Sequence, residues 1–104
     1  MQFMEADVAL TPEQKALVSE IIRQKLPAAQ VQVFGSRATG KARPYSDLDL
    51  LFIQPARLAW EVRYELEDAF ESSTLPFRVD LVDVETVSPQ MLKRIRSEAT
   101  VLPL

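Results

Sequence analysis

The chain contains only two glycines, Gly35 and Gly40, and both lie in one short segment. Glycine is the residue that most readily allows a tight backbone turn or a close approach to a ligand. Gly35 is followed by Ser36 and then, eleven residues after the serine, by Asp47-Leu48-Asp49 at the start of an apolar run. One stretch of sequence therefore combines a turn that suits a phosphate with a carboxylate pair that suits a metal ion.

The size and composition of the chain limit the possible folds and sites. Its 104 residues, 47% of them hydrophobic, suit a single domain over residues 1–104, with no second domain to enclose a substrate. The chain has no cysteine, which excludes disulfides and thiolate metal sites. It has no histidine, which excludes Ser-His-Asp and Cys-His catalysis and histidine-ligated zinc. Carboxylates and their metal ions are the main catalytic groups that remain.

Net charge and hydropathy predict the cellular location of the protein. A net charge of -3 argues against broad nucleic-acid binding, which relies on an extended cationic surface. Residues 1–7 lack the basic and then apolar pattern of a secretory signal. No apolar run approaches the roughly 20 residues that a membrane span needs. We expect a soluble, cytoplasmic protein without a membrane association.

Hydrophobic spacing predicts three main helices and three strands. A helix is expected to begin after Thr11, with Pro12 in its first turn and Gln14 completing a capping box. The predicted helices cover residues 12–26, about 57–71 and 89 to about 99, and the predicted strands cover 31–34, 48–53 and 77–82. Between the first two strands, residues 36–46 are expected to form a turn, a possible short helix and a loop.

The Asp47 and Asp49 side chains should share one face of the second strand, because they are two residues apart. Two carboxylates on one face repel each other unless a cation lies between them. Mg²⁺ usually takes one or two carboxylates together with phosphate oxygens and water, so this pair indicates a magnesium site. The alternative is that Asp47 caps a turn and Asp49 is a solvated strand residue.

Asp80 is an acid within the apolar third strand. If this strand lies beside the second one, Asp80 can join Asp47 and Asp49 as a metal ligand or as the base that takes a proton from an attacking hydroxyl. The alternative is an edge position open to water. Asp83, three residues later, is expected to cap the following turn.

The Gly35-Ser36 turn follows a strand, and free backbone N–H groups at the start of a helix favour an anion. Ser36 is expected to donate its hydroxyl to a terminal phosphate and Arg37 to add positive charge. Lys41 and Arg43 could steer a polyphosphate toward the carboxylates. The alternative is that Ser36 is a simple helix cap and Arg37 is a solvated surface residue.

Three segments together resemble the minimal nucleotidyltransferase (MNT) family of the DNA-polymerase-β-like superfamily. They are Gly35-Ser36-Arg37-Ala38-Thr39-Gly40, Ala42-Arg43-Pro44-Tyr45-Ser46-Asp47-Leu48-Asp49-Leu50-Leu51 and Val79-Asp80-Leu81-Val82-Asp83. The resemblance implies an α/β (α+β) fold, a small mixed sheet flanked by helices. It implies that Asp47, Asp49 and Asp80 bind Mg²⁺, two ions in all, and catalyse the reaction. It also implies that Gly35, Ser36 and Arg37 bind the triphosphate of ATP.

The resemblance further implies transfer of AMP to a hydroxyl, with a tyrosine of a HEPN-domain toxin as the acceptor and the chain as its antitoxin. Two other hypotheses stay open. The chain could neutralise a partner by contact alone, with Trp60 and Tyr64 as aromatic anchors unless they pack under the last helix. It could instead modify a small molecule of the aminoglycoside type, for which a homodimer would have to complete the acceptor pocket. The sequence leaves open whether a homo- or hetero-oligomer forms.

Overall fold

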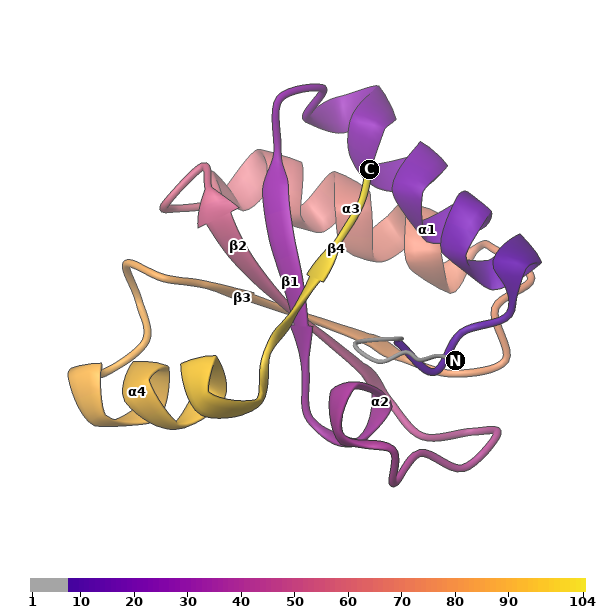
Figure 1. Cartoon of the computed structure of the whole chain (residues 1–104). Helices are drawn as coiled ribbons and strands as arrows, with labels where there is room; N and C mark the ends of the chain where they lie inside the picture. The colour runs from indigo at the N-terminus through magenta and orange to yellow at the C-terminus, as the bar shows by residue number, and fades with distance from the viewer. Residues whose placement is uncertain (1–7) are drawn as a thin grey trace.

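The computed structural model describes residues 8–104 (Figure 1). The predicted absence of a secretory signal falls on residues 1–7, which lie outside the described residues. In chain order the elements are α1 (Pro12–Lys25), β1 (Gln30–Phe34), α2 (Ser36–Thr39), β2 (Leu48–Gln54), α3 (Trp60–Glu71), β3 (Val79–Asp83), α4 (Pro89–Glu98) and β4 (Thr100–Leu102).

The strands of the described region form one mixed sheet in the order β3-β2-β1-β4. β1 pairs antiparallel with both β2 and β4, whereas β2 pairs parallel with β3. The parallel connection runs through α3, as a crossover between parallel strands requires. This arrangement confirms the mixed sheet with flanking helices that the resemblance implied.

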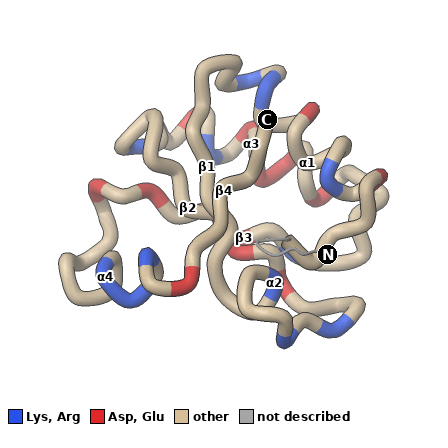
Figure 2. The backbone as a smooth tube through the Cα atoms, viewed as in Figure 1, with Lys and Arg blue, Asp and Glu red and all other residues tan. Residues whose placement is uncertain are grey.

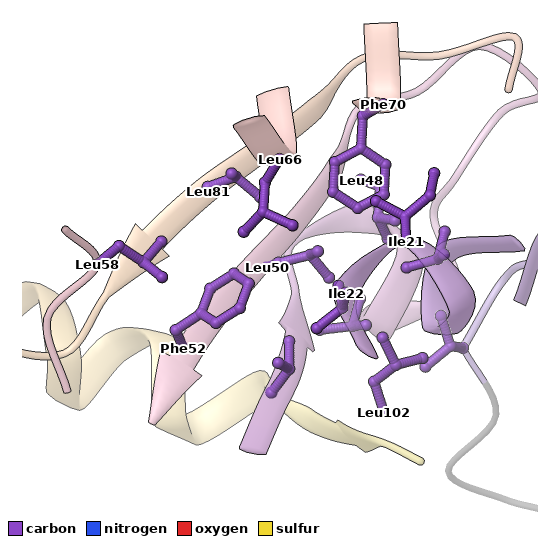
Figure 3. Packing of buried hydrophobic residues seen from close by; sticks show 14 of the residues in the cluster. Ile21, Ile22, Leu48, Leu50, Phe52, Leu58, Leu66, Phe70, Leu81 and Leu102 are labelled. Atoms are coloured by element: carbon purple, nitrogen blue, oxygen red, sulfur yellow. The ribbon is translucent and has the colours of Figure 1, made fainter. Parts of the chain in front are cut away.

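The main hydrophobic core lies between one face of the sheet and the helices α1 and α3 (Figure 3). Alternate residues of β2, namely Leu48, Leu50 and Phe52, are fully buried on this face. Ile22 of α1 and Leu66 of α3 reach the same cluster. Alternation along β2 thus turns Asp49 away from the core, as the sequence predicted.

The other face of the sheet carries Asp49 and is covered only in part. Leu51 of β2 and Ile95 of α4 are both buried, yet neither belongs to the main cluster. Figure 1 shows α4 set apart from α1 and α3, which lie side by side. The remainder of this face is left open for a site around Asp49.

The start of α1 matches its prediction. The Thr11 hydroxyl accepts a hydrogen bond from the Gln14 backbone N–H, and the Gln14 side chain accepts one from the Thr11 N–H, both at 3.0 Å. This reciprocal pair satisfies two N–H groups that the first helical turn would leave without partners. The helix ends at Lys25, two residues before Pro27.

Three elements differ from the sequence prediction. β3 covers Val79–Asp83 rather than residues 77–82. α3 begins at Trp60 rather than near Arg57, because the Leu58 N–H donates to the buried Asp83 carboxylate at 2.7 Å and Ala59 is extended. The strand β4 was not predicted. Its three residues pair with β1, and so short a strand depends on a partner that is distant in the sequence.

The predicted capping role of Asp83 is confirmed. Its carboxylate accepts hydrogen bonds from the Thr86 N–H at 3.1 Å and the Thr86 hydroxyl at 2.6 Å, and Arg63 lies 3.4 Å away. Burial alone would raise the pKa of Asp83, but the hydrogen bonds from Leu58 and Thr86 and the charge of Arg63 lower it overall.

No helix among residues 8–104 has the length and apolar character needed to cross a membrane.

The position of Leu50 at the centre of the core predicts a large stability loss on truncation. Replacing Leu50 with Ala should lower the free energy of unfolding by about 2–5 kcal/mol, because a buried cavity would remain. Met91→Ala, at a position that is 50% exposed, is the control and should change it by less than about 0.5 kcal/mol. Urea denaturation measures both. Equal losses in the two variants would contradict this description of the core.

Candidate active site

The strand register places two predicted acids side by side and the predicted glycine turn next to them. Phe34, the last residue of β1, pairs with Asp49 of β2, and Asp49 pairs with Asp80 of β3. Gly35 follows Phe34 directly and therefore lies next to Asp49. Asp47 stands one residue before β2 begins. The structure thus gathers the Gly35 turn and all three predicted acids at one end of the open sheet face.

Gly35 lies against the Asp49 carboxylate so closely that no side chain fits between them. Its backbone has φ 75° and ψ -157°, a conformation that residues with a Cβ atom rarely adopt. A Cβ atom added to Gly35 would overlap Oδ2 of Asp49. Gly40 also has a positive φ, 79°, but a Cβ atom there would meet nothing within 4 Å. Only the first glycine is therefore required by close approach as well as by backbone conformation.

The segment after Gly35 forms the short helix that the sequence suggested. α2 covers Ser36–Thr39, and Gly40 ends it in a left-handed conformation, with the Lys41 N–H donating to the Ser36 carbonyl at 3.1 Å. Within residues 8–104 the Ser36 hydroxyl makes no hydrogen bond. It is free to donate to an added ligand.

Glu98, to which the sequence analysis gave no role, reaches the same turn. Its carboxylate accepts a hydrogen bond from the Gly35 N–H at 2.7 Å. That N–H is therefore already engaged, and contacts with an anion at the turn would fall to Ser36 and the N–H groups after it. Glu98 is the last residue of α4 and lies 63 positions from Gly35 in the sequence, so no local spacing predicts this contact.

Burial and the repulsion of neighbouring carboxylates both oppose the ionisation of Asp49. Burial and, to a smaller extent, three neighbouring acids together raise the pKa of Asp49 to about 6. In decreasing order of influence they are Asp80, Asp47 and Glu98. A half-buried acid among three other acids is unfavourable when ionised, and a bound cation would remove that penalty.

The site suits a hard divalent cation by the chemistry of its donors. Asp47 and Asp80 are exposed and Asp49 is partly buried, so their oxygens can be reached from the open face. No three acidic side chains among the described residues already surround a common point. Asp49 with Asp80, or Asp49 with Asp47, would supply the one or two carboxylates that Mg²⁺ commonly uses, with phosphate and water completing the shell.

Arg37 is not positioned to bind a phosphate. It is 4% exposed, and its guanidinium donates to the backbone carbonyls of four residues. These are Ala9 at 2.6 Å, Ser46 at 3.0 Å, Pro44 at 3.1 Å and Arg43 at 3.3 Å. The guanidinium also lies over the Phe77 ring, 4.0 Å from its centroid. Neither the predicted phosphate contact nor the solvated alternative matches this placement.

The contacts of Arg37 hold the loop that leads to Asp47. Three of its four acceptors lie between residues 43 and 46, so one side chain ties this loop to α2. Burial lowers the pKa of Arg37, but the carbonyl dipoles satisfy its donors. Lys41 and Arg43 remain exposed in this loop, where Figure 2 shows blue segments next to α2.

Comparison with known proteins identifies the family of the chain that carries this site. The family described as "Polymerase beta, Nucleotidyltransferase" matches residues 17–103, which include the turn and all three acids. The chain belongs to this family. It is a nucleotidyltransferase, and it therefore uses a nucleotide.

One curated relative and two solved structures refine the comparison. "Probable protein adenylyltransferase MntA" of Haemophilus influenzae is 41% identical over 97 residues, covering 93% of this chain and 85% of the relative. A chain of a toxin-antitoxin crystal structure with AMP-PNP has a TM-score of 0.71 at 24% identity, covering 86% of this nucleotidyltransferase and 72% of that chain.

The second solved structure is a complex of a tri-AMPylated HEPN toxin with an MNT antitoxin from Shewanella oneidensis. One of its chains has a TM-score of 0.64 at 24% identity, covering 86% of this nucleotidyltransferase and 68% of that chain. At these identities the two structural matches support the fold, and the curated relative supports the family.

The two glycines provide a matched test of the turn. Gly35→Ala and Gly40→Ala should each cost about 1 kcal/mol of stability from backbone strain. Only Gly35→Ala should also displace Asp49, and it should reduce nucleotidyl transfer by about a hundredfold or more. Thermal unfolding and initial rates measure the two effects. Similar rates for both variants would show that close packing against Asp49 is unimportant.

The raised pKa of Asp49 predicts a metal-free protein that is less stable at neutral pH. The Asp49 carboxyl binds its proton more tightly in the folded state than in the unfolded chain. Its contribution to the free energy of unfolding is therefore complete below about pH 4 and is lost as the pH rises through about 6. Asp49→Asn should therefore raise the melting temperature of metal-free protein at pH 8 by a few degrees, which corresponds to about 1 kcal/mol after screening.

The same substitution should have a smaller effect at pH 4, where Asp49 of the natural protein is largely protonated. Differential scanning fluorimetry in EDTA at both pH values measures the difference. Glu61→Gln, an exposed acid on α3, is the control and should show little change at either pH. A lower melting temperature for Asp49→Asn at pH 8 would contradict the repulsion.

Proposed function

We propose that this chain is a Mg²⁺-dependent protein adenylyltransferase that transfers AMP from ATP to a tyrosine hydroxyl of a HEPN-domain toxin. The chain would act in the cytoplasm as the antitoxin of that toxin. The observation that carries the proposal is the register that places Asp49 beside Asp80 and next to the Gly35 turn. It brings a candidate phosphate turn and candidate metal ligands within reach of one reacting phosphate.

The relatives support both the reaction and the partner. The Haemophilus influenzae relative is named for protein adenylyl transfer, and it matches nearly the whole of this chain. The structural neighbours include a complex of an MNT antitoxin with a HEPN toxin that carries AMP groups. Another neighbour is a chain of a toxin-antitoxin crystal structure with AMP-PNP, an analogue of ATP. Transfer of AMP between such partners is therefore the activity that these likenesses favour.

The residues of this chain would have different roles in the reaction according to their positions. The Ser36 hydroxyl and the start of α2 would hold the triphosphate, and Asp47 and Asp49 would hold the two cations. Bound Mg²⁺ would offset the charge of the phosphate oxygens and of the acids. Asp80 would complete the metal site or accept the proton of the acceptor hydroxyl.

The proposed transfer needs no reactant other than ATP and the acceptor hydroxyl. The acceptor oxygen forms a bond to the α-phosphorus of ATP while the bond from that phosphorus to the bridging oxygen breaks. Pyrophosphate leaves, and the hydroxyl proton passes to a carboxylate or to solvent. Most of the rate enhancement would come from alignment of the reactants and from charge stabilisation, since no covalent enzyme intermediate is required.

The test combines the purified chain, Mg²⁺, α-labelled ATP and the HEPN protein encoded by the adjacent gene. Label should move to a tyrosine of the HEPN protein. Asp47→Asn with Asp49→Asn should lower the rate by about a thousandfold or more, because two metal ligands are lost. Glu61→Gln with Glu85→Gln removes two exposed carboxylates outside the site and should keep the rate. EDTA should abolish transfer.

The same variants separate catalysis from neutralisation by contact. If the Asp47→Asn and Asp49→Asn variant still silences the toxin in cells, the protein acts by binding alone. If it fails while still forming the complex, AMP transfer is required. Absence of label on the HEPN protein at every Mg²⁺ concentration would refute the proposed activity.

A further inference from the structure

The strand order separates a donor side of the site from an acceptor side. The Gly35 turn lies at the end of β1, Asp49 lies on the neighbouring β2, and Asp80 lies on β3 beyond it. In a displacement at phosphorus, the attacking and leaving oxygens lie on opposite sides. With the leaving pyrophosphate at the Gly35 turn, the acceptor hydroxyl must approach from the side of Asp80 and β3.

A groove of about 960 Å³ lies on that side. Asp47 and Asp80 line one part of it and Asp49 does not, so the groove reaches two of the three candidate catalytic acids. Its walls come from the C-terminal half of α3 and from residues 75–80, which lead into β3. An acceptor in this groove would reach Asp80 without crossing the donor side.

The groove has a marked excess of negative charge. Glu67, Asp68 and Glu71 of α3 line it, and all three are exposed. None of them forms an ion pair within residues 8–104. The one basic residue in its lining is Arg78. Even with Asp47 and Asp80 neutralised by cations, the groove would attract a positively charged ligand.

Two tyrosines stand in the lining with most of their surface in solvent. Tyr45 is 77% exposed beside Asp47, and Tyr64 is 65% exposed on α3. Large aromatic side chains in this setting are typical of protein–protein contacts. Tyr64 has not packed under α4, which was the alternative that the sequence left open for Trp60 and Tyr64. Trp60 is also exposed, at 74%, but it does not line the groove.

We propose that this groove binds a polypeptide segment with Lys or Arg side chains on both sides of the hydroxyl that receives AMP. The proposal rests on the proposed transfer and specifies the acceptor. The basic side chains would pair with Glu67, Asp68 and Glu71, while Tyr45 and Tyr64 contact the segment between them. Nucleic acid is disfavoured because its phosphates would face this acidic wall. An extended segment suits an open groove with exposed aromatic residues.

Binding can be measured without any AMP transfer, so the groove is tested separately from the proposed function. The probes are two fluorescein-labelled peptides that share a central tyrosine and differ in having Arg or Glu on both sides of it. Fluorescence anisotropy with Mg²⁺ and α,β-methylene-ATP, an analogue whose α–β bridge cannot be cleaved, should show that the Arg peptide binds about tenfold more tightly or better. Its affinity should fall as the salt concentration rises.

Matched variants locate the binding surface. Glu67→Gln, Asp68→Asn and Glu71→Gln together should weaken binding of the Arg peptide by about tenfold. The control Glu61→Gln, Glu65→Gln and Glu85→Gln removes the same charge from exposed positions outside the groove, and it should change affinity by less than about twofold. Tyr45→Ala with Tyr64→Ala should also weaken binding, whereas Trp60→Ala should not. Circular dichroism verifies that all variants are folded.

The outcomes are distinct. Equal binding of the two peptides, or equal losses in the groove variant and its control, would overturn the proposal. An aminoglycoside that displaces the Arg peptide and itself gains AMP would also overturn it, since the occupant would then be a small polycation. Binding as expected without AMP transfer to any protein would support the groove and refute the proposed function. With transfer intact, the groove variant should raise the KM for the acceptor and leave that for ATP unchanged.

Discussion

The pairing of β2 with its two neighbours is the interaction on which the site depends. One hydrogen-bond register places Phe34 opposite Asp49, and a second places Asp80 opposite Asp49. A shift of one residue in either ladder would move an acid to the core face, because side chains alternate along a strand. The fully buried residues Leu48, Leu50 and Phe52 make such a shift costly, so the hydrophobic face of β2 determines where its acid projects.

The site is assembled against an electrostatic cost that the rest of the fold must offset. Asp49 has a raised pKa because burial and neighbouring acids oppose its ionisation. Structures retain such unfavourable groups where a ligand compensates for them, and a cation with a nucleotide would do so here. Carboxylate repulsion, which lowers the stability of the metal-free protein, is then the same property that favours metal binding. This is a local exchange of stability for function.

Arg37 and Glu98 show how charged residues can act through the backbone. Arg37 donates to four carbonyls and holds the loop before Asp47, and Glu98 accepts a hydrogen bond from the Gly35 N–H, next to Asp49. Both side chains stabilise the geometry of the acids and the turn. Figure 2 shows acidic residues on α3, and three of them, Glu67, Asp68 and Glu71, form no ion pair within residues 8–104, which is consistent with a role toward a partner.

The sequence by itself determined the local features: the capping box of α1, the apolar face of β2, the glycine turn and the position of Asp49 away from the core. These depend on residues that are near one another in the chain, where spacing and side-chain type are informative. The tertiary structure alone decided that Asp80 pairs with Asp49, that β4 joins β1, that Arg37 is buried and that Glu98 reaches Gly35. Each of these joins segments that are separate in the chain or depends on which backbone carbonyls surround one side chain. Such contacts depend on tertiary packing, so no local sequence pattern predicts them.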